Sequence, residues 1–225
     1  MLILAIDTAL DACSAALFDS EANRVVAVET EVIGKGHAER LMAMISAVMT
    51  KASVDFNAID RIGVTVGPGS FTGIRVGLAT ARGLALAAGK PVVGVSTLEA
   101  IAREASTDKP FMVALDARRG ELYTQLYDGN HSAISDPQLL TIAEATTALT
   151  AALKPQVFGS GAPLLAEAQP SATIQVLGLT AYPDIENVAR ITAVTAAQSE
   201  PPKPLYLRAP DAKPQTRGVV ERRGD

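Results

Sequence analysis

The sequence has one cysteine, two histidines and no tryptophan in 225 residues. A single cysteine excludes an intrachain disulfide, which fits a reducing compartment. The histidines, His37 and His131, form no HxxH, HxxxH or HExxH motif, whereas a catalytic zinc site needs about three protein ligands. No GxSxG elbow is present to supply a serine nucleophile. The sequence therefore predicts neither a metal site nor serine-hydrolase chemistry.

Long apolar runs and an excess of basic charge are also missing. No stretch approaches the roughly 20 apolar residues of a membrane-spanning helix, and the first seven residues lack the basic lead-in of a signal peptide. The net charge is −4, whereas a protein that grips nucleic acid by itself usually carries a basic face. We therefore expect a cytoplasmic protein without membrane contact, which would meet RNA only through another subunit.

What the chain does have is 48% hydrophobic residues, enough for a sizeable core in one domain or two lobes. Short apolar runs and helical periodicity predict strands and helices that alternate along the first hundred residues. The expected strands are 2–8, 13–19, 24–31, 61–66 and 91–95, and the expected helices are 37–51, 73–88 and 97–105. This alternation favours an α/β fold whose sheet has parallel members.

The pattern then begins again. Residues 5–19 and 114–128 are both strand–turn–strand segments with aspartate at the third and last positions. Self-similarity of this kind favours two related lobes, and chance similarity of two hairpins is the alternative. We assign 1–105 to an N-terminal lobe, 106–208 to a smaller C-terminal lobe that ends with a helix at 184–197, and 209–225 to a disordered, proline-rich tail.

A glycine-rich loop between a predicted strand and a predicted helix is the strongest local signal. It consists of Gly67, Pro68, Gly69, Ser70, Phe71 and Thr72. Free N–H groups at such a helix start can hold an anion. However, no GK[ST] follows, and Thr72 stands where a dinucleotide-binding loop needs its third glycine. The alternative is a tight turn whose glycines allow close packing, so the loop is either structural or a weak anion site.

Two predicted helices have more apolar surface than one sheet would cover. The apolar residues of helix 37–51 span an arc of about 160°, compared with about 100° for a helix that packs on one side only. Helix 73–88 has only three polar residues, Arg75, Thr80 and Arg82, and such helices are usually buried on more than one side. Burial inside one chain and contact with a second protein are both open.

Several segments closely resemble the signature of the TsaB (YeaZ) family. The most specific is GPGSFTGIR at 67–75, which continues into VGLATARGLALA. The opening ILAIDTALDACSAAL, the run GHAERLMAMI, the run VVGVSTLEAIA at 92–102 and PLYLR near the C-terminus support it. Together they cover most of the first lobe and a little of the second. The resemblance implies an actin/Hsp70-like (ASKHA) fold of two RNase-H-like lobes, with mixed sheets flanked by helices.

The resemblance also implies a non-catalytic subunit that binds TsaD, the enzyme that transfers threonylcarbamoyl to adenosine in tRNA, helps to recruit the ATPase TsaE, and can form homodimers. TsaD carries metal-binding histidines in HxxxH spacing, but here Leu41 stands four residues after His37. We therefore expect no catalysis, no cofactor, and contact with tRNA only through the complex.

With the resemblance counted, the sequence favours a partner interface on the two apolar helices. The predicted interface residues are His37, Leu41, Met42, Met44, Ile45, Val48, Met49, Gly73, Arg75, Gly77, Leu78, Ala81 and Arg82. On this reading, Leu41→Glu or Met44→Glu should abolish TsaD binding while the chain stays folded.

The alternative function is an ATP-binding or ATP-hydrolysing enzyme of the actin/Hsp70/sugar-kinase superfamily. In that superfamily, hairpins like those that begin at Asp7 and Asp116 face a nucleotide between the lobes. The first turn here, residues 8–12, has no glycine, and Ala9 and Leu10 offer phosphate no side-chain donors. We therefore treat Asp7 and Asp116 as a vestigial nucleotide cleft.

Overall fold

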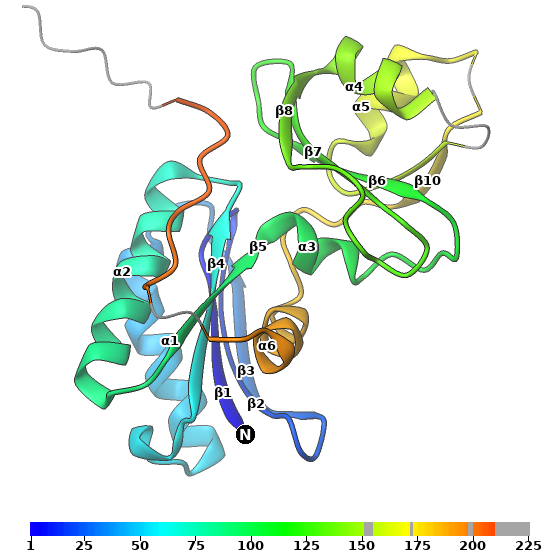
Figure 1. Cartoon of the computed structure of the whole chain (residues 1–225). Coiled ribbons are helices and arrows are strands. Elements are labelled where there is room, and N and C mark those ends of the chain that lie inside the picture. Colours follow the sequence, from blue (N-terminus) through cyan, green and yellow to red (C-terminus); the bar gives the residue numbers. More distant parts are fainter. Residues whose placement is uncertain (151–154, 172, 198–199, 210–225) are drawn as a thin grey trace, which may run out of the picture.

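Two five-stranded mixed sheets, one after the other along the chain, form the framework of the molecule (Figure 1). The structure is a computed structural model that describes residues 1–150, 155–171, 173–197 and 200–209. The predicted disordered tail, apart from its first residue, lies outside the described residues. No helix in the described ranges is long and apolar enough to cross a bilayer.

The first sheet has the order β3-β2-β1-β4-β5. Its strands are β1 (Leu2–Asp7), β2 (Ala12–Asp19), β3 (Arg24–Val32), β4 (Arg61–Gly67) and β5 (Val92–Ser96). β1, β2 and β3 form an antiparallel meander, while β4 runs parallel to β1 and β5 parallel to β4. Strands that are buried on both faces have nearly continuous apolar sequences, which explains the run LILAI in β1.

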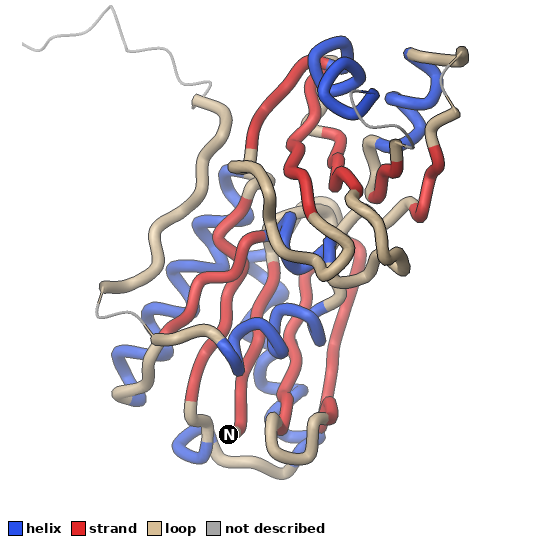
Figure 2. Tube along the Cα trace, turned by 45° about the vertical axis from the view of Figure 1, so that its right-hand side comes forward, coloured by secondary structure: helices blue, strands red, loops and turns tan. Residues whose placement is uncertain are grey.

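Helices cover both faces of this sheet (Figure 2). α1 (His37–Ala52) and α2 (Phe71–Ala88) pack on the face that carries Leu4 and Ile6 of β1. α6 (Ile185–Val194) packs on the opposite face, against Ile3 and Ala5. α3 (Thr97–Ala102) lies between the lobes. Its Ala100 packs in the apolar core of the first lobe, under α6, and its Leu98 packs in the apolar core of the second lobe. A short 3-10 helix, Phe56–Ala58, precedes β4.

The second sheet repeats the strand order of the first. Its strands are β6 (Phe111–Asp116), β7 (Glu121–Tyr127), β8 (Gln138–Thr141), β9 (Gln156–Phe158) and β10 (Gln175–Gly178), in the order β10-β9-β6-β7-β8. Read from β8, this is the order of the first sheet with every strand number raised by five. α4 (Ile142–Thr150) and α5 (Ala162–Ala168) cover one face. The predicted fold class, two lobes with mixed sheets flanked by helices, is therefore confirmed.

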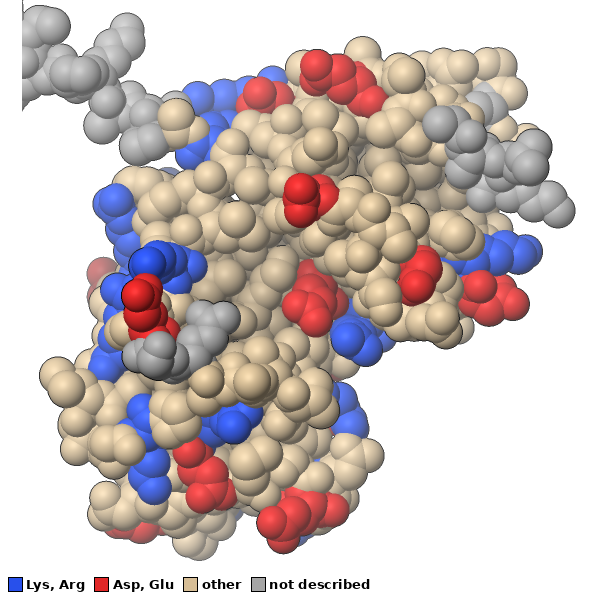
Figure 3. Space-filling view, viewed as in Figure 1, with Lys and Arg blue, Asp and Glu red and all other residues tan. Residues whose placement is uncertain are grey.

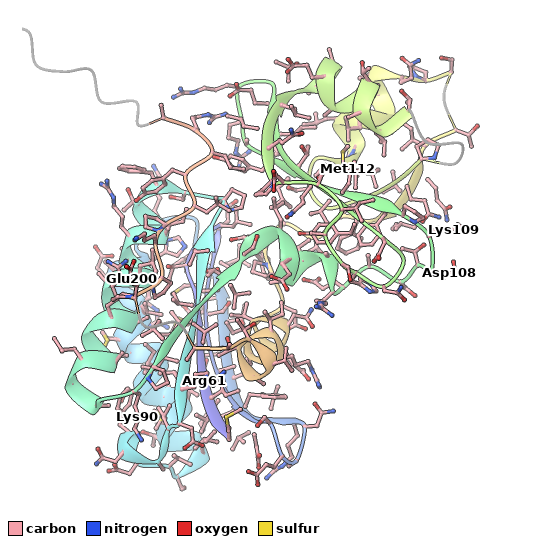
Figure 4. The ribbon with its side chains drawn as sticks, in the orientation of Figure 1. Arg61, Lys90, Asp108, Lys109, Met112 and Glu200 are labelled. Atoms are coloured by element: carbon pink, nitrogen blue, oxygen red, sulfur yellow. The ribbon has the colours of Figure 1, made fainter. Side chains whose placement is uncertain are left out.

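The lobes do not follow the predicted limits along the chain. α6 lies within the predicted C-terminal lobe of 106–208, yet it packs on the first sheet. Gly63 of β4 makes room for it, since a Cβ there would lie 2.0 Å from Thr192 Oγ1. Arg61 reaches the end of α6 and donates to the carbonyl oxygens of Thr192 and Thr195, at 2.9 and 2.6 Å (Figure 4). The N-terminal lobe is thus built from two separate stretches of chain.

Candidate functional site

The structure corrects most of the predicted interface on α1 and α2. Ten of the thirteen predicted interface residues are buried inside the first lobe. They are His37, Leu41, Met44, Ile45, Val48, Met49, Gly73, Gly77, Leu78 and Ala81. α1 and α2 lie next to one another over a single sheet, so the sheet and the neighbouring helix together cover the wide apolar arc. Leu41→Glu and Met44→Glu would therefore unfold the lobe rather than test an interface.

The glycines of α2 contact the chain's own first hairpin turn. A Cβ on Gly73 would lie 2.0 Å from the carbonyl oxygen of Thr8, and a Cβ on Gly77 would lie 2.6 Å from Thr8 Oγ1. Thr8 Oγ1 donates to the carbonyl of Gly73 at 2.7 Å. Only Gly83, further along α2, has open space around it. The small residues at Gly73 and Gly77 are therefore explained by packing within the lobe.

Some residues of the two helices remain exposed, and we call seven of them the outer face: Ala38, Met42, Arg75, Ala79, Arg82, Gly83 and Leu86. The other exposed positions of the two helices are Glu39, Arg40, Ala43, Ser46, Thr50, Lys51, Thr72 and Ala87. Met42 is 51% exposed and Leu86 is 86% exposed, both high for such apolar side chains. No acidic residue occurs between Asp60 and Glu99, and blue side chains lie along the left edge of the molecule in Figure 3, with red ones beside them. The charged members of the outer face are Arg75 and Arg82, so its own residues are apolar and cationic.

The glycine-rich loop is engaged by the same hairpin turn. The N–H of Ser70 donates to the carbonyl of Ala9 at 2.7 Å, and a Cβ on Gly69 would lie 2.2 Å from that oxygen. Ser70 caps α2 by accepting from the N–H of Gly73 at 3.3 Å. Gly67 has a φ of +105°, a conformation that favours glycine. These contacts support the structural interpretation of the loop over an anion site.

The two predicted cleft aspartates have different surroundings. Asp7 is fully buried, and its Oδ1 accepts from Thr65 Oγ1 at 2.5 Å and from the N–H of Ala9 at 3.1 Å. Its Oδ2 has no hydrogen-bond partner among the described residues. Burial raises the pKa of Asp7 to about 6, although the hydrogen bonds from Thr65 and Ala9 oppose the rise. Asp7 therefore lines no cleft, which corrects that part of the prediction.

Asp116 does lie at a pocket between the lobes, with a volume of about 550 Å³. Both hairpin turns reach this pocket, the first with Leu10 and Asp11 and the second with Ala117 and Arg118. The guanidinium of Arg118 lies 3.7 Å from Asp11 and 3.6 Å from Asp116. The turns thus pair with one another through an ion pair, and Asp11 would repel a phosphate placed between them.

Neither histidine is arranged as a metal ligand. Nε2 of His37 lies 2.9 Å from the carbonyl oxygen of Leu10, and Nε2 of His131 lies 2.8 Å from that of Ala105. In the parts of the chain that the structure describes, no three His, Cys, Asp or Glu side chains come together as a metal site would require. The histidines instead hold loops to the body of each lobe.

Sequence reasoning missed the contribution of the segment 200–209 to this region. Leu205, Tyr206, Leu207, Arg208 and Ala209 line the pocket between the lobes. The motif PLYLR was noticed only as a family signature. Its alternation of apolar residues with tyrosine and arginine was the available signal that the segment packs against other parts of the chain rather than trailing into solvent.

The chain resembles proteins linked by name to one tRNA modification. The family model described as "TsaD: tRNA N6-adenosine threonylcarbamoyltransferase" matches residues 23–212. The tRNA threonylcarbamoyladenosine biosynthesis protein TsaB of Escherichia coli is 38% identical over 137 residues, which cover 60% of this chain and 58% of that protein. The match thus spans less than two thirds of that relative. The uncharacterized protein Rv3421c of Mycobacterium tuberculosis is 34% identical over 225 residues, covering 94% of both chains.

Solved structures agree over most of the chain. The crystal structure of a Pseudomonas aeruginosa protein with similarity to peptidase YeaZ superposes with a TM-score of 0.78 at 29% identity, covering 92% of this chain and 99% of that one. YeaZ from Pseudomonas aeruginosa gives a TM-score of 0.73 at 29% identity, covering 85% and 90%.

Proposed function

The chain belongs to the TsaB (YeaZ) family, and on that premise we propose that it takes part in making threonylcarbamoyladenosine in tRNA as a non-catalytic subunit that binds TsaD. The names of its relatives supply the pathway. The binding role rests on the outer face of α1 and α2.

The outer face carries the proposal because it combines exposed apolar groups with the positive charges of Arg75 and Arg82. Exposed apolar side chains that gather on one surface are typical of protein–protein contact sites. Leu86 and Met42 would enter apolar pockets of the partner, and methionine adapts readily to irregular surfaces. Arg75 and Arg82 would pair with carboxylates of the partner around that apolar centre, as arginine often does at interfaces.

A non-catalytic role agrees with the surroundings of the candidate reactive groups in the part of the chain that the structure describes. The one strongly perturbed carboxyl group, Asp7, is closed off from solvent, so no substrate can reach it in this structure. The N–H groups of Ser70 and Gly73 are already engaged. We propose that the reaction, and any metal or cofactor that it needs, belongs to TsaD.

Two further roles complete the proposal. The assembled pair would offer TsaE a combined surface that neither subunit has alone, and tRNA would be held mainly by the other subunits, since this chain has a net charge of −4. The same outer face would serve for homodimerisation when TsaD is absent. We place all of these contacts in the cytoplasm.

An ATP-binding enzyme remains the second candidate because of the pocket between the lobes. Its volume of about 550 Å³ is suitable for a small ligand. The pairing of Asp11 with Arg118 argues against a phosphate at this place. Calorimetry with Mg-ATP on the purified chain separates the two functions, because micromolar binding would favour the enzyme.

The test of TsaD binding is the introduction of negative charge at the apolar positions of the outer face. Met42→Glu combined with Leu86→Glu should weaken binding to TsaD from the same organism at least about 100-fold, because each carboxylate would replace an apolar contact and face the carboxylates of the partner. The control is Val194→Glu, which changes a side chain that is 83% exposed on α6, at the opposite face of the sheet. Binding would be measured by calorimetry, and modification by reconstitution with TsaD, TsaE and tRNA.

Two results would contradict the proposal. If the double variant binds TsaD with the affinity of the unaltered chain, the outer face is not the interface. Modification at the normal rate in a reaction that lacks this chain would remove its role in the pathway.

A further inference from the structure

The segment 200–209 crosses from the first lobe to the second, and we call it the strap. It begins beside α2, where Figure 4 labels Glu200. Pro202 packs on β5 so closely that a Cβ on Gly94 would lie 2.7 Å from it, and Arg82 of α2 donates to its carbonyl oxygen. The N–H of Leu205 then donates to the carbonyl of Val66 at 2.7 Å. These contacts fix the first half of the strap to the first lobe.

The middle of the strap is held by a three-residue stack at the start of α2. The rings of Tyr206 and Phe71 lie 4.8 Å apart. The guanidinium of Arg75 lies 3.6 Å from the centre of the Phe71 ring, and its Nε donates to the hydroxyl oxygen of Tyr206 at 2.9 Å. A guanidinium over an aromatic face is an attractive arrangement. Arg75 thus holds Tyr206 from a position on the outer face.

The end of the strap is held by the second lobe. Nη1 of Arg208 donates to the carbonyl oxygen of Ala117 at 2.8 Å, and Nη2 pairs with Glu121. Leu207 packs against the core on the inner side of the second sheet. Only one residue separates the contacts of Tyr206 on the first lobe from those of Arg208 on the second. A movement at Tyr206 must therefore change the strain on the Arg208 contacts.

Arg75 belongs to two sets of contacts at once. Its side chain is exposed on the outer face, and it also orients the strap that lines the pocket between the lobes. A partner carboxylate that binds Arg75 would compete with the Tyr206 hydroxyl for the same donor, because a charged acceptor binds guanidinium more strongly than a phenol does. A conformational equilibrium shifts when a ligand binds one state better than the other.

We propose that the strap couples the outer face to the arrangement of the lobes: a protein partner that binds Arg75 loosens Tyr206 and, through it, the hold of Arg208 on the second lobe. This rests on the proposed function, since the partner is TsaD. Coupling between two sites is reciprocal. Releasing the strap from the second lobe must therefore make the outer face bind its partner more tightly.

Arg208→Ala tests the reciprocal effect without touching the outer face. The variant should bind TsaD at least about fivefold more tightly than the unaltered chain, which is the lower end of usual coupling between sites. The matched control is Lys203→Ala in the same strap. The Lys203 side chain is 78% exposed and pairs with Glu200, so its removal should leave the affinity unchanged.

Two direct readouts follow the strap itself. The chain has no tryptophan, so Leu205→Trp introduces a single tryptophan beside Tyr206 and keeps the hydroxyl that accepts from Arg75; its emission should shift to longer wavelength when TsaD is added. In the unaltered chain, TsaD should speed amide hydrogen exchange in residues 117–121, which lie in the other lobe from the outer face. Mixing with bovine serum albumin is the control and should change neither signal.

The outcomes separate this inference from the proposed function. If TsaD binds the unaltered chain, but Arg208→Ala has the same affinity and neither readout changes, the strap does not couple the two regions and the proposed function stands. If TsaD does not bind the unaltered chain at all, the proposed function and the coupling both fail.

Discussion

The two lobes share one strand order and differ in what surrounds it. Asp7 at the end of β1 accepts from the N–H two residues later, and Asp116 at the end of β6 does the same, at 3.1 and 2.8 Å. Asp19 and Asp128 repeat the match at the ends of β2 and β7, both at 2.9 Å. Yet Asp7 is fully buried, whereas the Asp116 side chain is 30% exposed.

This difference follows from the covering of each sheet. The first sheet has helices on both faces, including α6 from near the end of the chain, while the second has shorter strands, with α4 and α5 on its outer side and the short helix α3 on its inner side. The same local turn therefore becomes a buried carboxyl in one lobe and part of a pocket in the other. Local sequence sets the turn, and packing around it sets its chemistry.

The largest loss of stability is expected for a substitution at Gly73 of α2, which packs against the first hairpin turn. Gly73→Ala should destabilise the chain by about 3 kcal/mol, because the new methyl group collides with the Thr8 carbonyl, a backbone atom that cannot easily move. In the second lobe, Gly161→Ala should cost less, about 1–2 kcal/mol, since its shortest contact, at 2.7 Å, is with the movable side-chain end of Leu122 and the backbone of Ala114 lies further off, at 3.1 Å. Urea denaturation measures both.

Gly83→Ala is the control on the same helix. Nothing lies within 4 Å of the added methyl group, so the substitution should stabilise α2 by about 0.5–1 kcal/mol through helix propensity alone. A loss of stability in this variant, or none in Gly73→Ala, would contradict the packing that we describe.

The buried carboxyl of the first lobe should make stability depend on pH. Folding raises the pKa of Asp7 from 3.8 to about 6, so the folded state binds more protons between these values and stability falls as pH rises from 4 to 6. A shift of about two pKa units corresponds to about 3 kcal/mol. Asp7→Asn, which can still accept from Thr65 and Ala9, should therefore be more stable than the unaltered chain at pH 7 by up to this amount.

Thermal or urea unfolding between pH 4 and pH 7 would measure the effect. Asp116→Asn, at the equivalent but partly exposed position, is the matched control and should not stabilise the chain at pH 7. Equal stability of the chain and Asp7→Asn at pH 7 would mean that Asp7 is not desolvated as its burial indicates.

The smallest effect is expected for α6, which follows the second lobe in the sequence but packs on the sheet of the first lobe. The Asp184 side chain caps α6 by accepting from the N–H of Glu186, and Asp184→Ala should cost about 1 kcal/mol. For a chain of this size that is a fall of about 2–4 °C in melting temperature. Because α6 packs on the first sheet, faster amide exchange should appear in β1 rather than in β6. Exchange confined to the second lobe would contradict this assignment.

The sequence predicted the strands and helices of the first lobe to within a few residues, because their apolar periodicity is strong. It also predicted a helix that begins at Asp184, within one residue of the start of α6. The interface prediction was wrong for residues such as Leu41 and Met44, because periodicity gives the width of an apolar face but not how many neighbours cover it. The position of α6 was missed for the same reason, since nothing local indicates which of two sheets a helix packs on.

By itself, the sequence determined two α/β lobes with related hairpins and membership in one family, because strand patterns, turns and the GPGSFTGIR segment are all local features. Only the tertiary structure decided that Asp7 is buried from solvent and that Gly73 packs against the carbonyl of Thr8. It also decided that α6 packs in the first lobe and that the strap contacts both lobes. These depend on contacts between residues far apart in the chain, and such contacts exist only once the chain has folded.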